Sequence, residues 1–365
     1  MAAGRQGGRY FLEKTRVQWL DLCKFFGILY MVWGHAGVSK ELDIYLHAFH
    51  MPIFFFISGF LFHPERYTFP KFLWSRIKSL LIPYTVFGFG LSMLWNLVYS
   101  WLDPSQMVPV SEVLYSMATF NADLSPFAVV QWFLTCLFFV EIAFYLLVRL
   151  VRNHPIPIVL VMAACSIVGH FYHQWIPFRL ILALDCALVG IVFFGMGYGF
   201  SKVSHMKAGR WILSAPWWML PLCFAAGLGL SLWNGYVNMR TMTYQNYFLF
   251  YAAAICSIFF YLLLSIRLSG LSRFSQCWFY KGLLYLGQNT LILLLLNQSV
   301  KRLLYLLLPI REWRVMIGYY PGLCMDIGIM VAMFLLCIPC ALFFNRWLPW
   351  IVGKRFKRSQ LSPKA

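Results

Sequence analysis

The chain alternates between long apolar segments and short polar ones, and ten of the apolar segments extend over about 20 residues each. A helix of about 20 apolar residues crosses the hydrocarbon core of a bilayer. The pattern therefore predicts an all-α integral membrane protein, a bundle of about ten transmembrane helices. Their approximate limits are 18–37, 43–63, 80–101, 126–148, 156–175, 179–200, 213–234, 246–266, 282–303 and 322–345. The segments that meet around residues 175–179 are also compatible with a re-entrant hairpin.

The composition supports this fold class. Hydrophobic residues make up 61% of the chain and charged residues only 12%, whereas a soluble domain has about 25% charged residues. We therefore expect one transmembrane domain over residues 18–345, with an N-terminal tail over 1–17 and a basic C-terminal tail over 346–365. No separate soluble domain is predicted.

The net charge of +18 does not indicate nucleic-acid binding, because the basic residues fall mainly in alternate loops. Cytoplasmic loops of membrane proteins carry such an excess of Lys and Arg. We therefore expect both termini in the cytoplasm and a multi-pass protein of the inner (plasma) membrane, with lipids as its surroundings. Of the 30 Lys and Arg residues, the predicted outer loops hold only Lys40, Arg179, Arg240, Lys301, Arg302, Arg311 and Arg314.

The first predicted helix carries charges that are rare inside membranes. Burying Asp, Lys or Arg at mid-bilayer costs about 2.5 kcal/mol or more each. Lys24 and His35 are eleven residues apart, close to three helical turns, so they share one face and lie roughly 16 Å apart along it. Asp21 lies one turn before Lys24, where the two can pair. The helix would thus carry an ion pair near one membrane surface and an imidazole near the other.

His35 has a structural and a functional interpretation. It could bond a backbone carbonyl between packed helices, or it could act as a general base, which suits a group with an ordinary pKa of about 6.5. The charges on its face and His50 on the next helix favour the general base. His47 and His50 could join His35 in a metal site, but no carboxylate stands at ligand spacing and no HExxH motif is present, so we expect no metal.

The first long inner loop holds a basic patch, Arg66, Lys71, Arg76 and Lys78. Such a patch can simply set orientation in the membrane. It can also clamp a phosphorylated donor, because Arg binds phosphate in bidentate geometry. Glu141, in the fourth predicted span, could be a buried acid, a partner of Lys24 across the bundle, or a surface partner of Arg149. Asp185 and Asp326 are isolated acids in apolar runs with no evident partner.

The ten cysteines lie almost all in apolar runs and are typical of small buried hydrophobic residues. Cys337 and Cys340 form a CxxC pair, but inside an apolar helix and without a second pair. A zinc or redox role is therefore not predicted.

Six segments carry a resemblance to a known family. They are WLDLCKFFGILYMVWGH, HMPIFFFISGFLF, SRIKSLLIPY, QWFLTCLFF, FFGMGYGF and LGQNTLILLL. Together they resemble the acyltransferase-3 family of integral membrane acyltransferases, and most closely its sugar O-acetylase branch, which includes fucose 4-O-acetylase-like proteins. The family's basic residue–x10–His motif falls on Lys24 and His35. The family's RxxR motif falls on Arg76 and Ser79, so its second arginine is missing here. Lys78, next to Ser79, is the residue that could substitute for it.

The resemblance implies transfer of an acetyl or other short acyl group from cytoplasmic acetyl-coenzyme A to a sugar hydroxyl. The acceptor would be a cell-envelope polysaccharide, lipopolysaccharide or lipid-linked glycan. In that scheme His35 acts as the base, or forms an acyl-histidine intermediate, with His50 beside it. Its donor-side residues would be Asp21, Lys24, Arg76 and Lys78, and Trp132 or Asn289 would stabilise the oxyanion.

Two other classes of function remain open at this point. A transporter or flippase of lipid-linked glycan would also carry intramembrane charges, although inverted repeats, which would favour it, are not detected in the sequence. A non-catalytic membrane scaffold is the second alternative. The concentration of His, Lys and Asp on the first hairpin argues against a scaffold.

Overall fold

The computed structural model describes residues 17–120, 130–176, 178–316 and 319–354. In these ranges the regular secondary structure is helical, apart from an isolated antiparallel bridge between Asn238 and Thr243. The first half contains α1 (Gln18–Ala36), α2 (Lys40–Phe49), α3 (Pro52–Phe60), η1 (Pro64–Arg66), α4 (Phe69–Arg76), η2 (Ile77–Leu81), α5 (Ile82–Leu102), η3 (Pro104–Gln106), α6 (Val110–Thr119), α8 (Trp132–Leu150) and α9 (Pro155–Trp175). The second half contains η4 (Ile181–Ala183), α10 (Leu184–Val203), α11 (Lys207–Leu213), α12 (Met219–Asn234), α13 (Tyr247–Gly270), α14 (Ser272–Gln276), α15 (Trp278–Gln288), α16 (Thr290–Leu307), α17 (Ile310–Met316) and α18 (Tyr319–Trp347).

The all-α membrane architecture is confirmed. Eight helical segments of the described chain are long and apolar enough to cross a membrane. They are Lys40–Phe60, Phe69–Leu102, Trp132–Leu150, Pro155–Tyr172, Ile181–Val203, Tyr247–Gly270, Thr290–Leu307 and Gly322–Trp347. The other two predicted spans correspond to α1, which carries the charged Asp21 and Lys24, and to α12, which has only 16 residues. Most of both predicted tails lies outside the described residues, but Ile351 and Val352 are buried against the domain.

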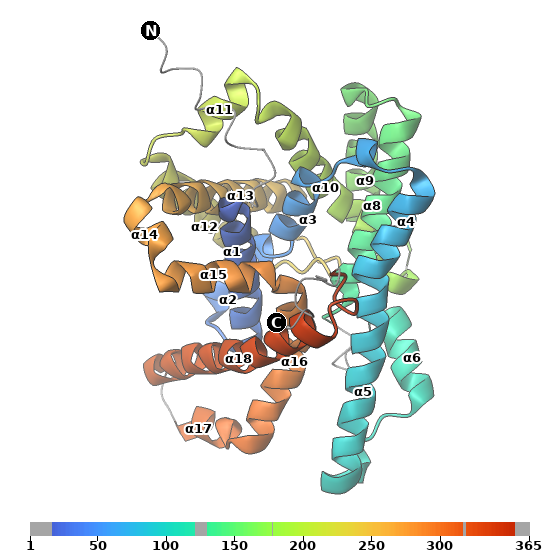
Figure 1. The fold of residues 1–365 in the computed structure, drawn as a ribbon, viewed down its shortest axis with the longest axis vertical. Coiled ribbons are helices and arrows are strands. Elements are labelled where there is room, and N and C mark those ends of the chain that lie inside the picture. Colours follow the sequence, from blue (N-terminus) through green and yellow to red (C-terminus); the bar gives the residue numbers. More distant parts are fainter. Residues whose placement is uncertain (1–16, 121–129, 177, 317–318, 355–365) are drawn as a thin grey trace, which may run out of the picture.

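Helix α1 lies at the centre of the bundle, where it packs against α13, α15, α16 and α18 (Figure 1). Leu22 and Ile28 are fully buried on it. The helix ends at Gly37, whose φ of 131° is accessible to glycine but not to residues with a Cβ. His35 therefore stands in the last turn of α1, and Lys24 stands in the second.

Two predicted spans are interrupted by breaks in the helix. The first still corresponds to one membrane-long segment, Lys40–Phe60, whereas the second is shifted to Thr290–Leu307. The span predicted at 43–63 breaks after Phe49, because Pro52 lacks an N–H and its ring clashes with the carbonyl four residues earlier. The break leaves His50 buried at the end of α2. The span predicted at 282–303 breaks at Asn289, whose side-chain amide donates to the Tyr285 carbonyl at 2.8 Å and competes with the helical bond.

Helices α3 and α10 touch backbone to backbone. A Cβ at Gly59 would lie 1.8 Å from the Phe194 carbonyl oxygen, and one at Gly197 would lie 1.9 Å from the Phe56 carbonyl oxygen. Small residues at helix interfaces permit such close approach in membrane proteins. This contact fixes α3, the second half of the first hairpin, against α10. Helix α3 in turn forms one wall of the candidate site.

Candidate active site

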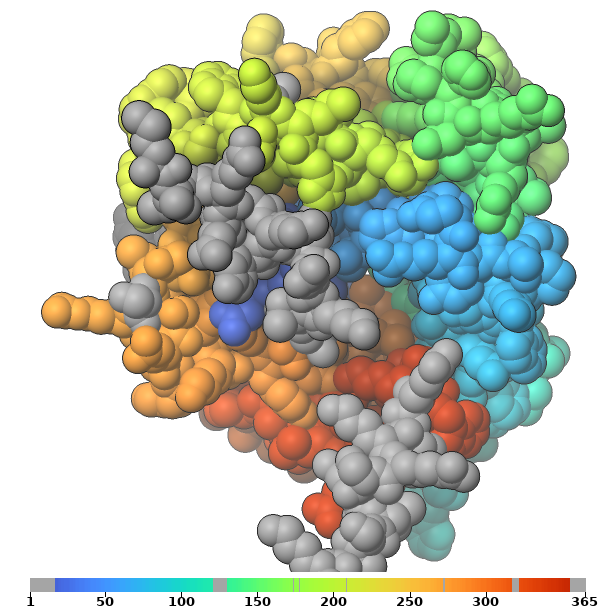
Figure 2. Space-filling model, turned by 45° about the horizontal axis from the view of Figure 1, so that its top comes forward, coloured from blue at the N-terminus to red at the C-terminus, as the bar shows by residue number. Residues whose placement is uncertain are grey.

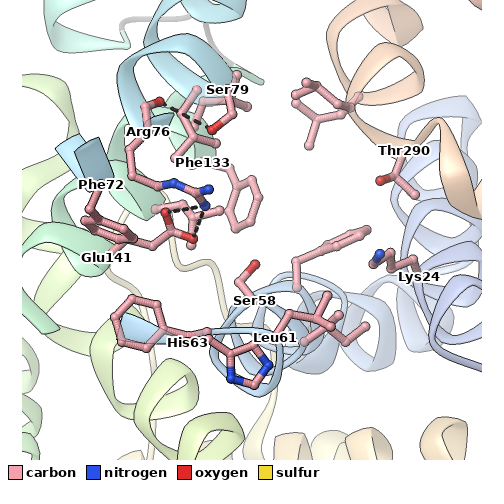
Figure 3. Close-up of a pocket in the computed structure, with 18 of the residues that line it drawn as sticks. Lys24, Ser58, Leu61, His63, Phe72, Arg76, Ser79, Phe133, Glu141 and Thr290 are labelled. Atoms are coloured by element: carbon pink, nitrogen blue, oxygen red, sulfur yellow. Dashed lines mark hydrogen bonds and ion pairs between the residues drawn. The ribbon is translucent and has the colours of Figure 1, made fainter. Parts of the chain in front are cut away.

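A cavity of about 370 Å³ opens among α1, α3, α4, α8 and α16, close to the basic patch. We call it the basic cavity. Its titratable lining residues are Lys24, His63, Arg66, Tyr67, Arg76 and Glu141, and most of the remaining wall is apolar. Figure 2 shows this side of the molecule, where the blue segment that includes η1 and α4 faces the orange segment that includes α14 and α15. Lys24 and Thr290 lie across the cavity from Arg76 and Glu141 (Figure 3).

Glu141 is the acid partner of Arg76, not of Lys24 or Arg149. The Arg76 Nη1 donates to both carboxylate oxygens of Glu141, at 3.1 and 3.3 Å, and Glu141 is buried. Arg149 instead donates to the main-chain carbonyls of Pro64 and Tyr67. The prediction of a buried acid is therefore confirmed, whereas the two predicted partners are wrong, because α4 brings Arg76 against α8 from a position 65 residues earlier.

The predicted pair on α1 is present. The Lys24 ammonium lies 3.5 Å from Asp21 Oδ1, and Asp21 is buried while Lys24 is partly exposed to the basic cavity. Lys78, in contrast, does not line the cavity; its ammonium lies over the Trp74 ring, 4.9 Å from the centroid. Arg66 does line it, so the cations of the cavity wall come from three separate elements, α1, η1 and α4.

A second cavity of about 170 Å³ lies at the other end of α1, and we call it the histidine cavity. It is lined by His35, His47, His50, Trp132 and Arg240 together with Met31, Met51, Val130, Asn238, Met239 and Leu294. Helix α1 supplies His35, and the break at Pro52 directs His50 to the same space. Arg240, predicted from the sequence only as an outer-loop charge, lies between Met239 and Met242, which are both buried.

The three histidines of this cavity differ in how they are held. The Nδ1 of His50 lies 2.6 Å from the Leu46 carbonyl oxygen, so Nδ1 carries the hydrogen and Nε2 is left as an acceptor. His47 Nδ1 lies 2.9 Å from Asp43 Oδ1. Within the described part of the chain, His35 has no hydrogen-bond partner, so its ring nitrogens are available to a ligand. No group of residues that could hold a metal ion occurs among the described residues.

The two cavities approach each other at one side chain. Leu294, on α16, lines both of them, and the neighbours Trp132 and Phe133 on α8 each line one. Along α1, the cations of the basic cavity therefore come first and the imidazoles of the histidine cavity come last. The apolar side chain of Leu294 lies between the two cavities. This order can hold phosphates at one end and move a proton at the other.

Asn289 lines neither cavity. Its side-chain oxygen accepts hydrogen bonds from Asn345 at 2.7 Å and from the Lys354 ammonium at 2.8 Å. It therefore ties the start of α16 to the end of α18, and its geometry does not support a role in oxyanion stabilisation. Trp132, the other residue predicted for that role, lines the histidine cavity.

Burial and the neighbouring positive charge of Arg179 lower the pKa of Arg240, which belongs to the connection between α12 and α13. Arg179 itself forms an ion pair with Asp185, and Arg314 forms one with Asp326. These two pairs supply the partners that the sequence left unassigned for the two acids.

Comparison with protein families gave one match, to a family described as acyltransferase domain, over residues 17–344. Comparisons with curated proteins and with solved structures gave no match. The matched range contains both cavities and, from α1 to α17, every helix, together with nearly all of α18.

Proposed function

Because the chain belongs to the acyltransferase-3 family and is thus a membrane acyltransferase, we propose that it transfers an acetyl or other short acyl group from acyl-coenzyme A to a sugar hydroxyl. The acceptor is a cell-envelope polysaccharide, lipopolysaccharide or lipid-linked glycan, as in the sugar O-acetylase branch that the motifs resemble. The observation that supports this proposal most directly is the pair of cavities that meet at Leu294, one lined by cations and the other by histidines.

In this proposal the donor binds in the basic cavity, with its phosphates near Arg66 and Arg76 and its thioester arm directed past Lys24. Arg76 is paired with Glu141 and Lys24 with Asp21, and Arg66 adds a third cation to the wall. Asp21 holds Lys24 in position. The arm then passes Leu294, so that the thioester carbonyl enters the histidine cavity. Lys78, whose ammonium lies over the Trp74 ring and outside the cavity, has no contact with the donor in this proposal.

In this proposal, residues that line the histidine cavity carry out the acyl transfer. A ring nitrogen of His35 takes the proton of the acceptor hydroxyl as its oxygen attacks the thioester carbonyl carbon. The carbon–sulfur bond then breaks, and the imidazolium returns the proton to the departing thiolate, which leaves as coenzyme A. The Trp132 indole N–H is suited to bond the carbonyl oxygen as it becomes negative. His50, oriented by its bond to Leu46, positions the acceptor.

The distribution of basic residues supports a plasma-membrane protein with cytoplasmic termini, which puts the basic cavity on the side where acyl-coenzyme A is found. The proposal is tested by incubating the purified protein with labelled acetyl-coenzyme A and envelope glycan. Label in the glycan is the expected result. If the protein moves glycan across vesicle membranes without transferring label, it is a transporter and the proposal is wrong.

A further inference from the structure

Arg240 is held rigidly in the wall of the histidine cavity. It lies in the connection between α12 and α13, which is closed by the bridge between Asn238 and Thr243. The Asn238 side-chain oxygen accepts a hydrogen bond from the Arg240 N–H at 3.0 Å, and the Arg240 Nη1 donates to the Phe120 carbonyl at 3.3 Å. Both the backbone and the guanidinium are therefore oriented before any ligand binds, which lowers the cost of binding.

The charge of Arg240 is not balanced by an acid of the described chain. Asp185 is paired with Arg179, which neighbours Arg240, and Asp43 is paired with His47 of the same cavity. Among the described lining residues of the cavity there is no carboxylate. Arg240 is partly buried, and its guanidinium bonds a neutral carbonyl but no acid, so this site favours a ligand that brings a negative charge.

We propose that the acyl acceptor is an acidic glycan, with a carboxylate or phosphate group on or next to the sugar that is acylated. The guanidinium of Arg240 binds that group, and the ring of Trp132, which lines the same cavity, packs against the sugar. This inference rests on the proposed function. It narrows the acceptor from any envelope glycan to an anionic one, and it gives Arg240 a role in acceptor recognition instead of membrane orientation.

The test uses envelope glycan from the source cell, treated with mild alkali to remove existing esters and separated by anion exchange into neutral and acidic pools. Purified protein and labelled acetyl-coenzyme A should label the acidic pool at least about tenfold faster than the neutral pool. Carbodiimide–borohydride reduction of carboxylates, or removal of phosphate with hydrofluoric acid, should abolish that preference. The treatment that does so identifies the anionic group.

Two outcomes separate the inference from the function on which it rests. Equal labelling of both pools, or a preference for the acidic pool that survives both treatments, would overturn the acidic acceptor while leaving acyl transfer intact. No labelling of any pool would overturn the proposed function and this inference with it.

Variants of Arg240 directly test its role in binding the acidic acceptor. Arg240→Gln should raise KM for the acidic pool about tenfold or more, because a hydrogen bond between charged groups is lost. Arg302→Gln is the matched control: it removes the same charge from α16, where the guanidinium lies over the Tyr99 ring outside the cavity. Arg240→Lys keeps the charge without the planar guanidinium and should give an intermediate KM. This variant still tests the role of Arg240 if Arg240→Gln does not fold. A wild-type KM in a folded Arg240 variant lacking the guanidinium would overturn the assignment.

Discussion

The Nη1 of Arg76 lies 3.1 Å from one carboxylate oxygen of Glu141 and 3.3 Å from the other. The two side chains come from α4 and α8 and close one side of the basic cavity. Their exposure is unequal: 27% of the Arg76 side chain is accessible and only 6% of the Glu141 side chain. Removing Arg76 and removing Glu141 should therefore destabilise the protein by different amounts.

Arg76→Gln should destabilise the protein more than Glu141→Gln. The first variant leaves a buried carboxylate without a partner, which costs about 3 kcal/mol or more, whereas the arginine left by the second can reach water. The double variant Arg76→Gln/Glu141→Gln should recover much of the loss. The measurement is unfolding in mixed micelles. Equal destabilisation by the two single variants would contradict this account of the pair.

Arg66→Gln should weaken binding of coenzyme A about tenfold, because Arg66 lines the basic cavity and bonds between charged groups are the strong ones. Lys78→Gln removes the same charge from outside the cavity and should bind coenzyme A like the wild type. Titration calorimetry on the purified variants measures both affinities. A larger loss in Lys78→Gln than in Arg66→Gln would place the donor elsewhere.

His35→Gln should lower the turnover number by about two orders of magnitude or more, because glutamine has no basic nitrogen near neutral pH. Its stability should change little, since no described residue bonds His35 in the wild type. The control is His50→Gln, whose amide can still donate to the Leu46 carbonyl, and its turnover should fall less. Wild-type turnover in His35→Gln together with loss in His50→Gln would assign the base to His50.

Leu294→Phe should reduce acyl transfer at least about tenfold while coenzyme A still binds, because a larger ring at the divide blocks the path between the cavities. Leu294→Met conserves volume and should cost less than about 1.5 kcal/mol in stability, with transfer near the wild-type rate. The two rates are measured with the same labelled donor. Equal transfer by both variants would mean that the thioester reaches the acceptor by another route.

Gly197→Ala should destabilise the bundle by roughly 1–3 kcal/mol, because its methyl group would meet the Phe56 carbonyl at 1.9 Å and separate α3 from α10. Gly199→Ala, two residues later on the same helix, meets nothing within 4 Å and should be neutral or slightly stabilising. Thermal unfolding in detergent compares the two. Similar unfolding temperatures would show that α3 and α10 can separate without cost.

The sequence alone determined the features that depend on neighbours along the chain. Hydrophobic segments of about 20 residues predicted the all-α membrane fold, because the bilayer thickness sets the length of a spanning helix. The pairing of Asp21 with Lys24 and the common face of Lys24 and His35 followed from 3.6 residues per turn. These relationships hold wherever the helix packs, so no tertiary information was needed for them.

Tertiary structure decided which polar groups share a space. Glu141 meets Arg76 across 65 residues of chain, Arg240 enters the cavity of His35 from a distant loop, and Asn289 is drawn to Lys354 instead of either cavity. Local periodicity cannot predict such meetings, because they depend on the rotation and approach of whole helices. Those are set by packing between distant segments, as the contact of Gly59 and Gly197 with opposing backbones shows.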